Sequence, residues 1–242
     1  MLQKSKAIAI HSVRYGESSL ITYLYSLEKG RVTVMVNKAF GGGKGRSKAV
    51  YFQPLTLLNV VYYPGKHHGM GRLKEVSPYE LHSNIQFNET KRAVAIFLGE
   101  LFYRTVREEE SNPALFDFME NAIQILDVLE DGVPNFHLVF LVQFSKYLGF
   151  YPNGKFSEST PIFDFKNGVY TQSEPSHPLF FNSFNSQLLT KLLQENFTSS
   201  AQLSLNHNQR NAFVDLMLIY YSYHMEAVHG MKSLAVLKQV FS

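Results

Sequence analysis

Residues 30–48 read GRVTVMVNKAFGGGKGRSK, a strand-like segment that runs directly into a glycine-rich basic loop. Valines at alternate positions of its first half are typical of a strand with one buried face. The loop carries no acid and four cations, Lys38, Lys44, Arg46 and Lys48. Because like charges at this density repel one another, the loop favours an anionic partner, and a phosphodiester backbone fits best. A solvated loop tip without a ligand is the alternative interpretation.

Four further segments of the first eighty residues have the composition of strands. They are rich in β-branched and aromatic residues and are separated by turn signals such as Glu28-Lys29-Gly30 and Pro64-Gly65. The five expected strands cover residues 6–11, 18–27, 31–38, 55–63 and 70–76. Five short strands without a long helical period predict a small closed barrel, and the five-stranded OB fold fits their number and size.

After residue 87 the apolar period changes from two residues to 3.6. Residues 88–110 carry an apolar stripe with charges opposite, and Asn112-Pro113 then supplies a cap and a first-turn proline for a second helix. Further helices are expected over residues 135–147, 185–196, 208–229 and 232–241.

Residues 151–178 differ from this helical pattern. Prolines interrupt two short strand-like runs that flank an Asn167-Gly168 turn signal. The predicted fold class is therefore α+β. A five-stranded OB-fold β-barrel in residues 1–80 is followed by a mainly α-helical domain in residues 81–242, with a small β-hairpin insertion at 151–178.

Charge is distributed unevenly along the chain of 242 residues. The net charge is +3, but residues 1–80 hold twelve Lys and Arg against four Asp and Glu, and the remainder holds eleven against sixteen. Such an asymmetry indicates two modules with different partners. There is no cysteine, which excludes disulfides and thiolate metal sites. Neither a signal-peptide pattern nor an apolar run of membrane length is present, so a cytoplasmic protein without membrane contact is expected.

The sequence contains no pattern typical of a catalytic site. The basic loop fits neither the P-loop nor the Rossmann pattern, because Gly43-Lys44 is followed by Gly45 and then by a strand. Nine histidines are scattered without a metal-binding spacing, and no serine elbow is present. The acidic run Glu108-Glu109-Glu110 is a candidate for a magnesium-dependent nuclease, with a solvated acidic patch as the alternative. Binding without a cofactor or metal is favoured over catalysis.

Aromatic side chains lie between the cations of the first module. Phe40 is inside the basic loop, and Tyr51 and Phe52 follow it. Stacking of bases on such rings tolerates any base sequence. We expect Phe40 to contact bases, and Tyr51 and Phe52 to cap the barrel core.

Five stretches, taken together and in order, carry a resemblance to a known family. They read AIAIHSVRYGESSLITYLYSLEKGRVTVMVNKA (7–39), FQPLTLL (52–58), GMGRLKEV (69–76), ELFYRTVREEESNPALFDFM (100–119) and YYSYHMEAVHGMKSLAVLKQVF (220–241). The set resembles RecO, the bacterial recombination mediator family, over nearly the whole chain. The resemblance implies an OB domain followed by a helical bundle with an inserted zinc ribbon, in a protein that is not an enzyme.

The resemblance also implies partners and contacts. It implies binding of single- and double-stranded DNA, annealing of complementary strands, and loading of a recombinase onto DNA coated with single-strand-binding protein (SSB), together with RecR at the nucleoid. The family's basic positions match Arg14, Lys38, Lys44, Arg46 and Lys48, and the DNA-binding set expected here adds Phe40 and Arg72. The family also accepts the acidic tail of SSB in its helical domain. The expected helix 135–147 offers only Lys146, so this site is not assigned.

The insertion departs from the family pattern because it lacks the four zinc-binding cysteines of many members. We therefore expect no zinc, and expect the hairpin to be held by packing of Phe156, Phe163, Phe165 and Tyr170. A generic OB-fold RNA-binding or translation-associated factor remains an alternative function. A scaffold that acts only through protein partners is another.

Overall fold

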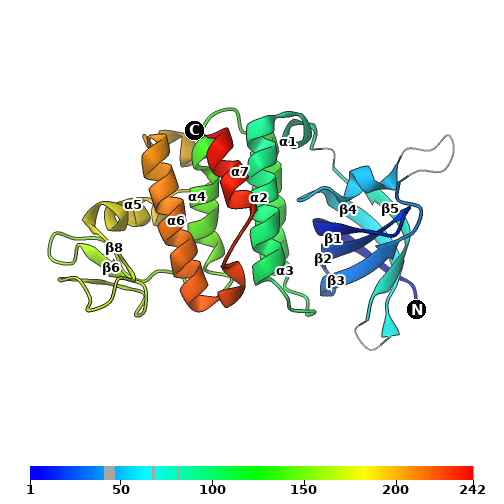
Figure 1. Ribbon diagram of the computed structural model, residues 1–242, viewed down its shortest axis with the longest axis horizontal. Helices are drawn as coiled ribbons and strands as arrows, with labels where there is room; N and C mark the ends of the chain where they lie inside the picture. The colour runs from blue at the N-terminus through cyan, green and yellow to red at the C-terminus, as the bar shows by residue number, and fades with distance from the viewer. Residues whose placement is uncertain (41–46, 67–68, 81, 242) are drawn as a thin grey trace. The chain divides into compact units, whose positions relative to one another are not determined.

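The computed structural model describes residues 1–40, 47–66, 69–80 and 82–241 (Figure 1). The chain divides into two compact units, Met1–Asp127 and Val128–Ser242. The helices that follow the barrel up to residue 127 belong to the first unit. The domain boundary after residue 80 stays a prediction.

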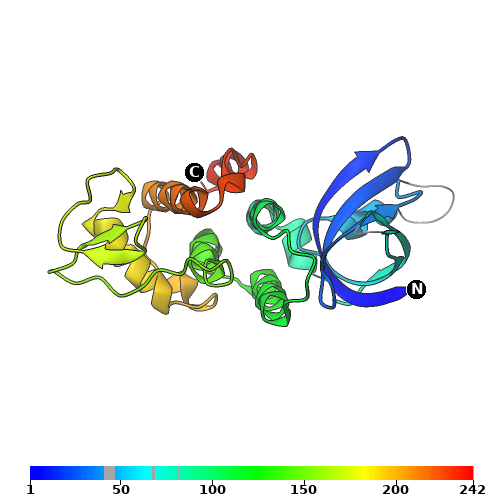
Figure 2. The same cartoon turned by 90° about the horizontal axis from the view of Figure 1, so that it is seen from below.

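The first unit begins with a closed five-stranded barrel in the strand order β1-β2-β3-β5-β4 (Figures 1 and 2). Neighbouring strands are antiparallel except for β3 and β5, which run parallel. The predicted OB-like barrel is thereby confirmed. Its elements are β1 (Gln3–Tyr15), β2 (Ser19–Ser26), β3 (Gly30–Val36), the 3-10 helix η1 (Lys48–Phe52), β4 (Leu57–Tyr63) and β5 (Gly71–Pro78).

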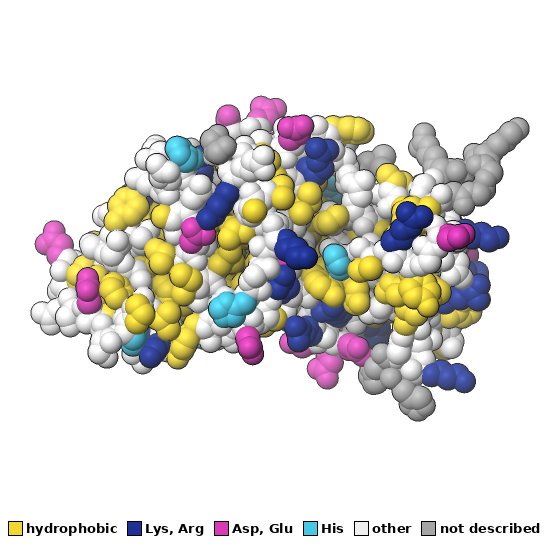
Figure 3. Space-filling model, viewed as in Figure 1, with side chains coloured by type: hydrophobic (Ala, Val, Ile, Leu, Met, Phe, Trp, Pro, Cys, Tyr) yellow, Lys and Arg dark blue, Asp and Glu magenta, His cyan; other side chains and the backbone are white. Residues whose placement is uncertain are grey.

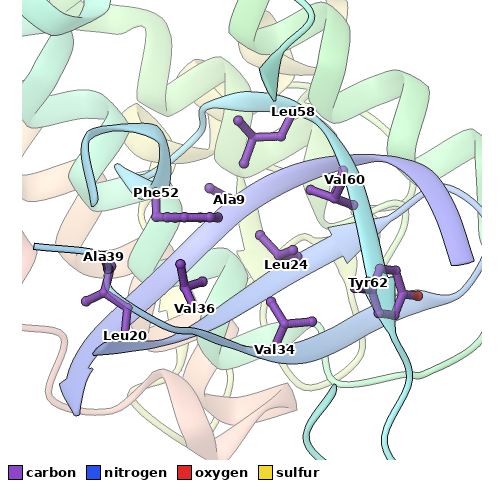
Figure 4. Packing of buried hydrophobic residues seen from close by; sticks show 11 residues of the cluster. Ala9, Leu20, Leu24, Val34, Val36, Ala39, Phe52, Leu58, Val60 and Tyr62 are labelled. Atoms are coloured by element: carbon purple, nitrogen blue, oxygen red, sulfur yellow. The ribbon is translucent and has the colours of Figure 1, made fainter. Parts of the chain in front are cut away.

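Apolar side chains fill the barrel interior (Figure 4). Ala9, Leu24, Val34, Val60 and Tyr62 belong to one cluster, and none is more than 3% exposed. Burial of a valine or leucine side chain such as Leu24 or Val34 stabilises a fold by about 1.5–3 kcal/mol, so this cluster is a main source of the barrel's stability.

A β-bulge decides which side chains of β1 face this core. The pairing passes from Ala9 opposite Leu24 to His11 opposite Tyr23, which leaves Ile10 as the extra residue. Ala9 lies in the barrel cluster, whereas Ile10 is buried outside it, on the strand that packs against α2 (Glu89–Thr105).

The short helix α1 (Ser83–Phe87) follows the barrel in the chain. The next two helices, α2 and α3 (Pro113–Val128), cover the outer side of β2 at Tyr25. The Tyr25 ring packs edge-on against Phe102 with 5.0 Å between ring centroids, and its centroid lies 6.3 Å from that of Phe116. The buried Lys91 of α2 donates to the backbone oxygen of Asp127 at 2.6 Å. These contacts join the helices and the barrel into one unit.

The second unit is helical and contains a small sheet. Its helices are α4 (Val133–Phe144), α5 (Ser183–Gln194), α6 (His207–His224) and α7 (Ser233–Val240), with 3-10 turns η3 (Ser199–Gln202) and η4 (Glu226–Val228). The three-stranded sheet has the order β7-β6-β8. The predicted hairpin is present as β6 (Ile162–Asp164) and β7 (Val169–Thr171), and β8 (Phe180–Phe181) is an additional strand.

Aromatic rings join this sheet to α6. The Phe165 ring lies 4.7 Å from that of Phe181 and 5.3 Å from that of Tyr220, and Phe163 lies 5.1 Å from Tyr170. The backbone N–H of Phe156 donates to Thr190 Oγ1 of α5 at 2.9 Å, and packing of its ring in this cluster stays a prediction. Among the described residues, no three or more His, Asp or Glu side chains gather as a metal site. Nor does any described helix combine the length and apolar character of a membrane span.

Candidate nucleic-acid interface

Ala39 anchors the described base of the basic loop to one end of the barrel. It is fully buried, and its N–H donates to the backbone oxygen of Ser18 at 2.6 Å. Its own carbonyl accepts from the N–H of Ala49 at 3.1 Å and from Ser47 Oγ at 2.6 Å. The chain on both sides of the loop is thereby tied to the β1–β2 turn.

Lys38 and Lys48 lie on the two sides of this anchor. Both side chains are exposed. Lys38 has a φ of +53°, in the left-handed region where a residue with a Cβ is disfavoured by about 1–2 kcal/mol. The backbone turns at Lys38, so that its side chain reaches solvent while the next residue, Ala39, is buried in the core.

Arg14 and Phe40 form a cation–π pair at the same end of the barrel. The Arg14 guanidinium carbon lies 4.9 Å from the centre of the Phe40 ring, and Nη2 donates to the backbone oxygen of Glu17 at 2.9 Å. Phe40 is 41% exposed. A guanidinium has five N–H donors, so Arg14 retains donors for an anion while the ring fixes its plane.

Arg72 reaches this group through Asn37. It is the second residue of β5, beside Met35 of β3 and opposite Tyr63 of β4, and it is exposed. With the Asn37 amide oxygen turned toward it, Arg72 donates from Nε and from Nη2 over 3.2 Å each. Because Asn37 directly precedes Lys38, Arg72 belongs to the same cationic group.

Some described cations of the first unit are engaged by carboxylates or backbone carbonyls of the fold, and others are not. Lys6 pairs with Glu120 at 3.3 Å and Lys74 with Glu75 at 3.4 Å. Arg31 donates to two backbone carbonyls, of Tyr103 and Val106, at 3.0 and 3.1 Å. In contrast, the barrel-end cations Arg14, Lys38, Lys48 and Arg72 have no ion pair with any described carboxylate. Their positive charge is available to a ligand.

The structure thus brings together five of the seven residues expected to bind DNA, namely Arg14, Lys38, Phe40, Lys48 and Arg72. Lys44 and Arg46 lie outside the described residues. Whether any of the seven binds DNA stays a prediction. Asn37 was missed by the sequence analysis, because its link to Arg72 joins strands that only the barrel's closure brings side by side.

The acidic run 108–110 contacts the barrel through its backbone. The carbonyl of Glu108 accepts the N–H of Arg31 at 2.9 Å, and the Glu108 carboxylate accepts the N–H of Arg107 at 3.0 Å. The segment therefore supports the start of β3, whatever the role of its side chains.

The comparisons with known proteins agree across the whole chain. Residues 1–82 match the family model described as Recombination protein O N terminal, and residues 88–235 match Recombination protein O C terminal. The DNA repair protein RecO of Flavobacterium psychrophilum is 35% identical over 240 residues, which cover 99% of each chain. That of Christiangramia forsetii is 35% identical over 244 residues, covering each chain completely. This protein therefore belongs to the RecO family and has a role in DNA repair and recombination.

Proposed function

We propose that this protein is a non-catalytic recombination mediator that binds single- and double-stranded DNA and anneals complementary strands. With RecR it helps to load the recombinase onto SSB-coated DNA at the nucleoid. The observation that supports DNA binding is the group of barrel-end cations, four exposed side chains without a carboxylate partner around residues 37–40. Annealing needs only that two phosphate backbones are screened while base edges stay free, so no bond has to be broken.

A salt titration of DNA binding tests the role of the barrel-end cations. Log affinity for single strands falls with log salt by about 0.7 per phosphate that is neutralised. Changing Arg14, Lys38, Lys48 and Arg72 together to alanine should therefore flatten the slope by roughly 3 units if all four are used. The measurement is fluorescence anisotropy of a labelled oligonucleotide at several salt concentrations.

The matched control removes four exposed lysines of the second unit, Lys146, Lys155, Lys166 and Lys191. It lowers the net charge by the same amount and should leave the slope close to that of the wild type. Equal slopes for the wild type and the barrel-end variant would refute the proposed interface. Tighter binding of structured RNA than of single-stranded DNA would favour an RNA-binding function instead, and cleavage of DNA with magnesium or manganese would refute the non-catalytic assignment.

The mediator step is tested separately, on single strands coated with SSB. Recombinase loading is measured with this protein alone, with RecR alone and with both. Stimulation that needs both proteins supports the proposal. Loading that proceeds equally with the barrel-end variant would show that DNA contacts of the barrel are not needed for it.

A further inference from the structure

The last residue of α1 is a phenylalanine that the fold leaves almost entirely in water. Phe87 is 86% exposed, and apart from Met1 no described large hydrophobic side chain is more exposed. Figure 3 shows exposed hydrophobic side chains near the upper edge of the view, together with Lys or Arg and Asp or Glu, in the region where Figure 1 labels α1 and α2. A single exposed ring is common on proteins, so its surroundings decide what it can do.

A hollow of about 230 Å³ lies beside Phe87, within the first unit. Its apolar lining consists of Pro54, Ile85, Ala95 and Ile96, and Gln53, Gln86 and Arg92 complete it. Ile96 is 38% exposed at its rim. An apolar cavity of about 150 Å³ is large enough to bind benzene, so this hollow can admit one phenyl ring.

The walls of the hollow are fixed by contacts of the fold. The N–H of Ile85 donates to the carboxylate of Asp127 at 2.8 Å, which ties α1 to the end of α3. Pro54 packs closely on α2, where a Cβ added at Gly99 would lie 2.8 Å from the Cβ of Pro54. Because the hollow is formed before any partner binds, little ordering is needed to fill it.

Two charged side chains of α2 lie next to the ring and the hollow. Glu89 and Arg92 are three positions apart, so they lie on the same side of the helix, and both are exposed. Neither has an ion pair with a described residue. Arg92 Nη1 donates to the backbone oxygen of Gln86 at 3.3 Å, which leaves other guanidinium donors for a partner.

These features, which we call the α1–α2 patch, are complementary to one another. The ring of Phe87 fits the hollow, and the charge of Glu89 is opposite to that of Arg92. In a contact with two-fold symmetry, residue i of one copy meets residue j of the other, and residue j meets residue i. A second copy of this chain would therefore fill both hollows with rings and pair both acids with both bases. Any other protein would have to supply a ring, a hollow and both charges in the matching places.

We propose that the α1–α2 patch is a two-fold contact between copies of this chain, and that copies joined there bring two DNA strands together for annealing. The contact stands on the patch alone, whereas its use in annealing rests on the proposed function. Annealing needs two phosphate backbones screened at once, and two joined copies supply two groups of barrel-end cations. The patch and these cations share no residue, so one copy can use both.

The contact is a weak one in free solution. A stable interface buries about 800 Å² per partner, and a single ring with its surroundings covers less. We therefore expect a dissociation constant that is micromolar or weaker. Copies held on the same DNA meet at a much higher effective concentration, so pairing should be favoured there.

Removal of the ring tests the contact by sedimentation velocity over a concentration series that extends to several hundred micromolar. Burial of one such ring changes an equilibrium constant by at least roughly tenfold, and each pair contains two rings. Phe87→Ala should therefore raise the dissociation constant by at least roughly a hundredfold. Tyr223→Ala, which removes a ring 46% exposed in the second unit, is the control and should associate like the wild type.

An exchange of charges tests the symmetry of the contact without removing the ring. Glu89→Arg alone brings only positive charges to the contact, and Arg92→Glu alone brings only negative ones, so each variant should associate more weakly than the wild type. An equimolar mixture of the two variants again places opposite charges across the contact and should restore association. Because the same two proteins are compared alone and mixed, misfolding of either cannot produce this recovery.

The annealing rate of complementary labelled oligonucleotides tests the functional part. Phe87→Ala should keep the single-strand affinity of the wild type and lose most of its annealing rate. The two charge variants should each anneal slowly and recover the rate when mixed. Annealing by Phe87→Ala at the wild-type rate would overturn the use of the contact in annealing.

The remaining outcomes separate the contact from the proposed function. A wild type that stays monomeric over the whole series, both free and bound to oligo-dT, would refute the contact, as would undiminished association of Phe87→Ala or no recovery in the mixture of charge variants. A photoreactive benzoylphenylalanine at position 87 should crosslink to residues 53–54 or 92–96 of a second copy, and crosslinks to RecR or SSB instead would overturn the proposal in favour of another protein partner. A wild type that associates but binds no DNA would refute the proposed function and support the contact alone.

Discussion

Replacing His137 by glutamine should remove a large part of the acid sensitivity of the second unit. His137 lies within α4 and is 3% exposed, and its ring is stacked with that of Phe241 with centroids 6.0 Å apart. Burial, assisted by the nearby positive charge of Arg210, lowers the pKa of His137 to about 3. The charged form of this histidine is thus strongly disfavoured in the folded protein.

The sign of the effect follows from comparing the two states. An unfolded histidine has a pKa of about 6.5, so as the pH falls the unfolded chain binds a proton that folded His137 does not. The stability that neutral His137 contributes is fully present above pH ~6.5 and is lost progressively as the pH falls to ~3. Between pH 7.5 and 4.5 this single group should lower the free energy of unfolding by about 2 to 3 kcal/mol, at 1.36 kcal/mol per pH unit.

The assay is urea unfolding at both pH values in a Tyr223→Trp background, because that reporter lies on α6 in the same unit as α4. For wild type and for His137→Gln, the free energy of unfolding at one pH is subtracted from that at the other. Any loss of stability that the substitution causes equally at both pH values cancels in this difference. His207→Gln, at an exposed position, is the control. Equal losses of stability in wild type and His137→Gln would refute the assignment of this histidine as a neutral buried group.

Two further substitutions test the backbone and the aromatic cluster. Gly30→Ala should destabilise the first unit by more than Gly16→Ala. Both glycines have a φ near +60°, so both substitutions carry the left-handed penalty of about 1–2 kcal/mol, but only at Gly30 would the new Cβ also clash with the Glu110 carbonyl oxygen. Thermal unfolding of the two variants measures the additional loss of stability that the clash causes. Phe165→Ala should lower the free energy of unfolding by roughly 3–5 kcal/mol, because this ring is fully buried against Phe181 and Tyr220. A chelator added to the wild-type protein should leave its melting temperature unchanged. A melting temperature that falls with chelator would contradict the zinc-free interpretation.

Local pattern was sufficient to predict much of the barrel. Alternation of Val32, Val34 and Val36 predicted β3, and the structure buries the last two in the core. The bulge at Ile10 could not be predicted in the same way, because an extra residue in one strand leaves no mark on composition. The strand β8 was missed for a related reason: two residues, Phe180–Phe181, are too few to show a period.

The candidate site was predictable in composition but not in detail. Lys6 and Lys38 are both lysines of a basic segment, yet Lys6 is paired with Glu120, 114 positions away, and Lys38 has no described carboxylate partner. No spacing rule connects residues so distant in the chain. Arg72 likewise joins the group only because β3 and β5 become neighbours when the barrel closes.

Arg14 and Arg31 show why pairing, rather than charge, separates binding residues from structural ones. Each lies over an aromatic ring, and from the sequence either is an equally good candidate to bind a phosphate. Arg31 lies over two rings and donates to two carbonyls that join β3 to the end of α2, so binding an anion there would require breaking contacts of the fold. Arg14 lies over the half-exposed Phe40 and donates to one turn carbonyl, so it can bind an anion while those contacts persist. Moving Arg31 away from its two carbonyls would leave these buried acceptors without a donor, at about 1–3 kcal/mol each, whereas an exposed guanidinium only exchanges water for phosphate. The charge left unpaired by folding is therefore the part of the basic composition that a DNA ligand can use.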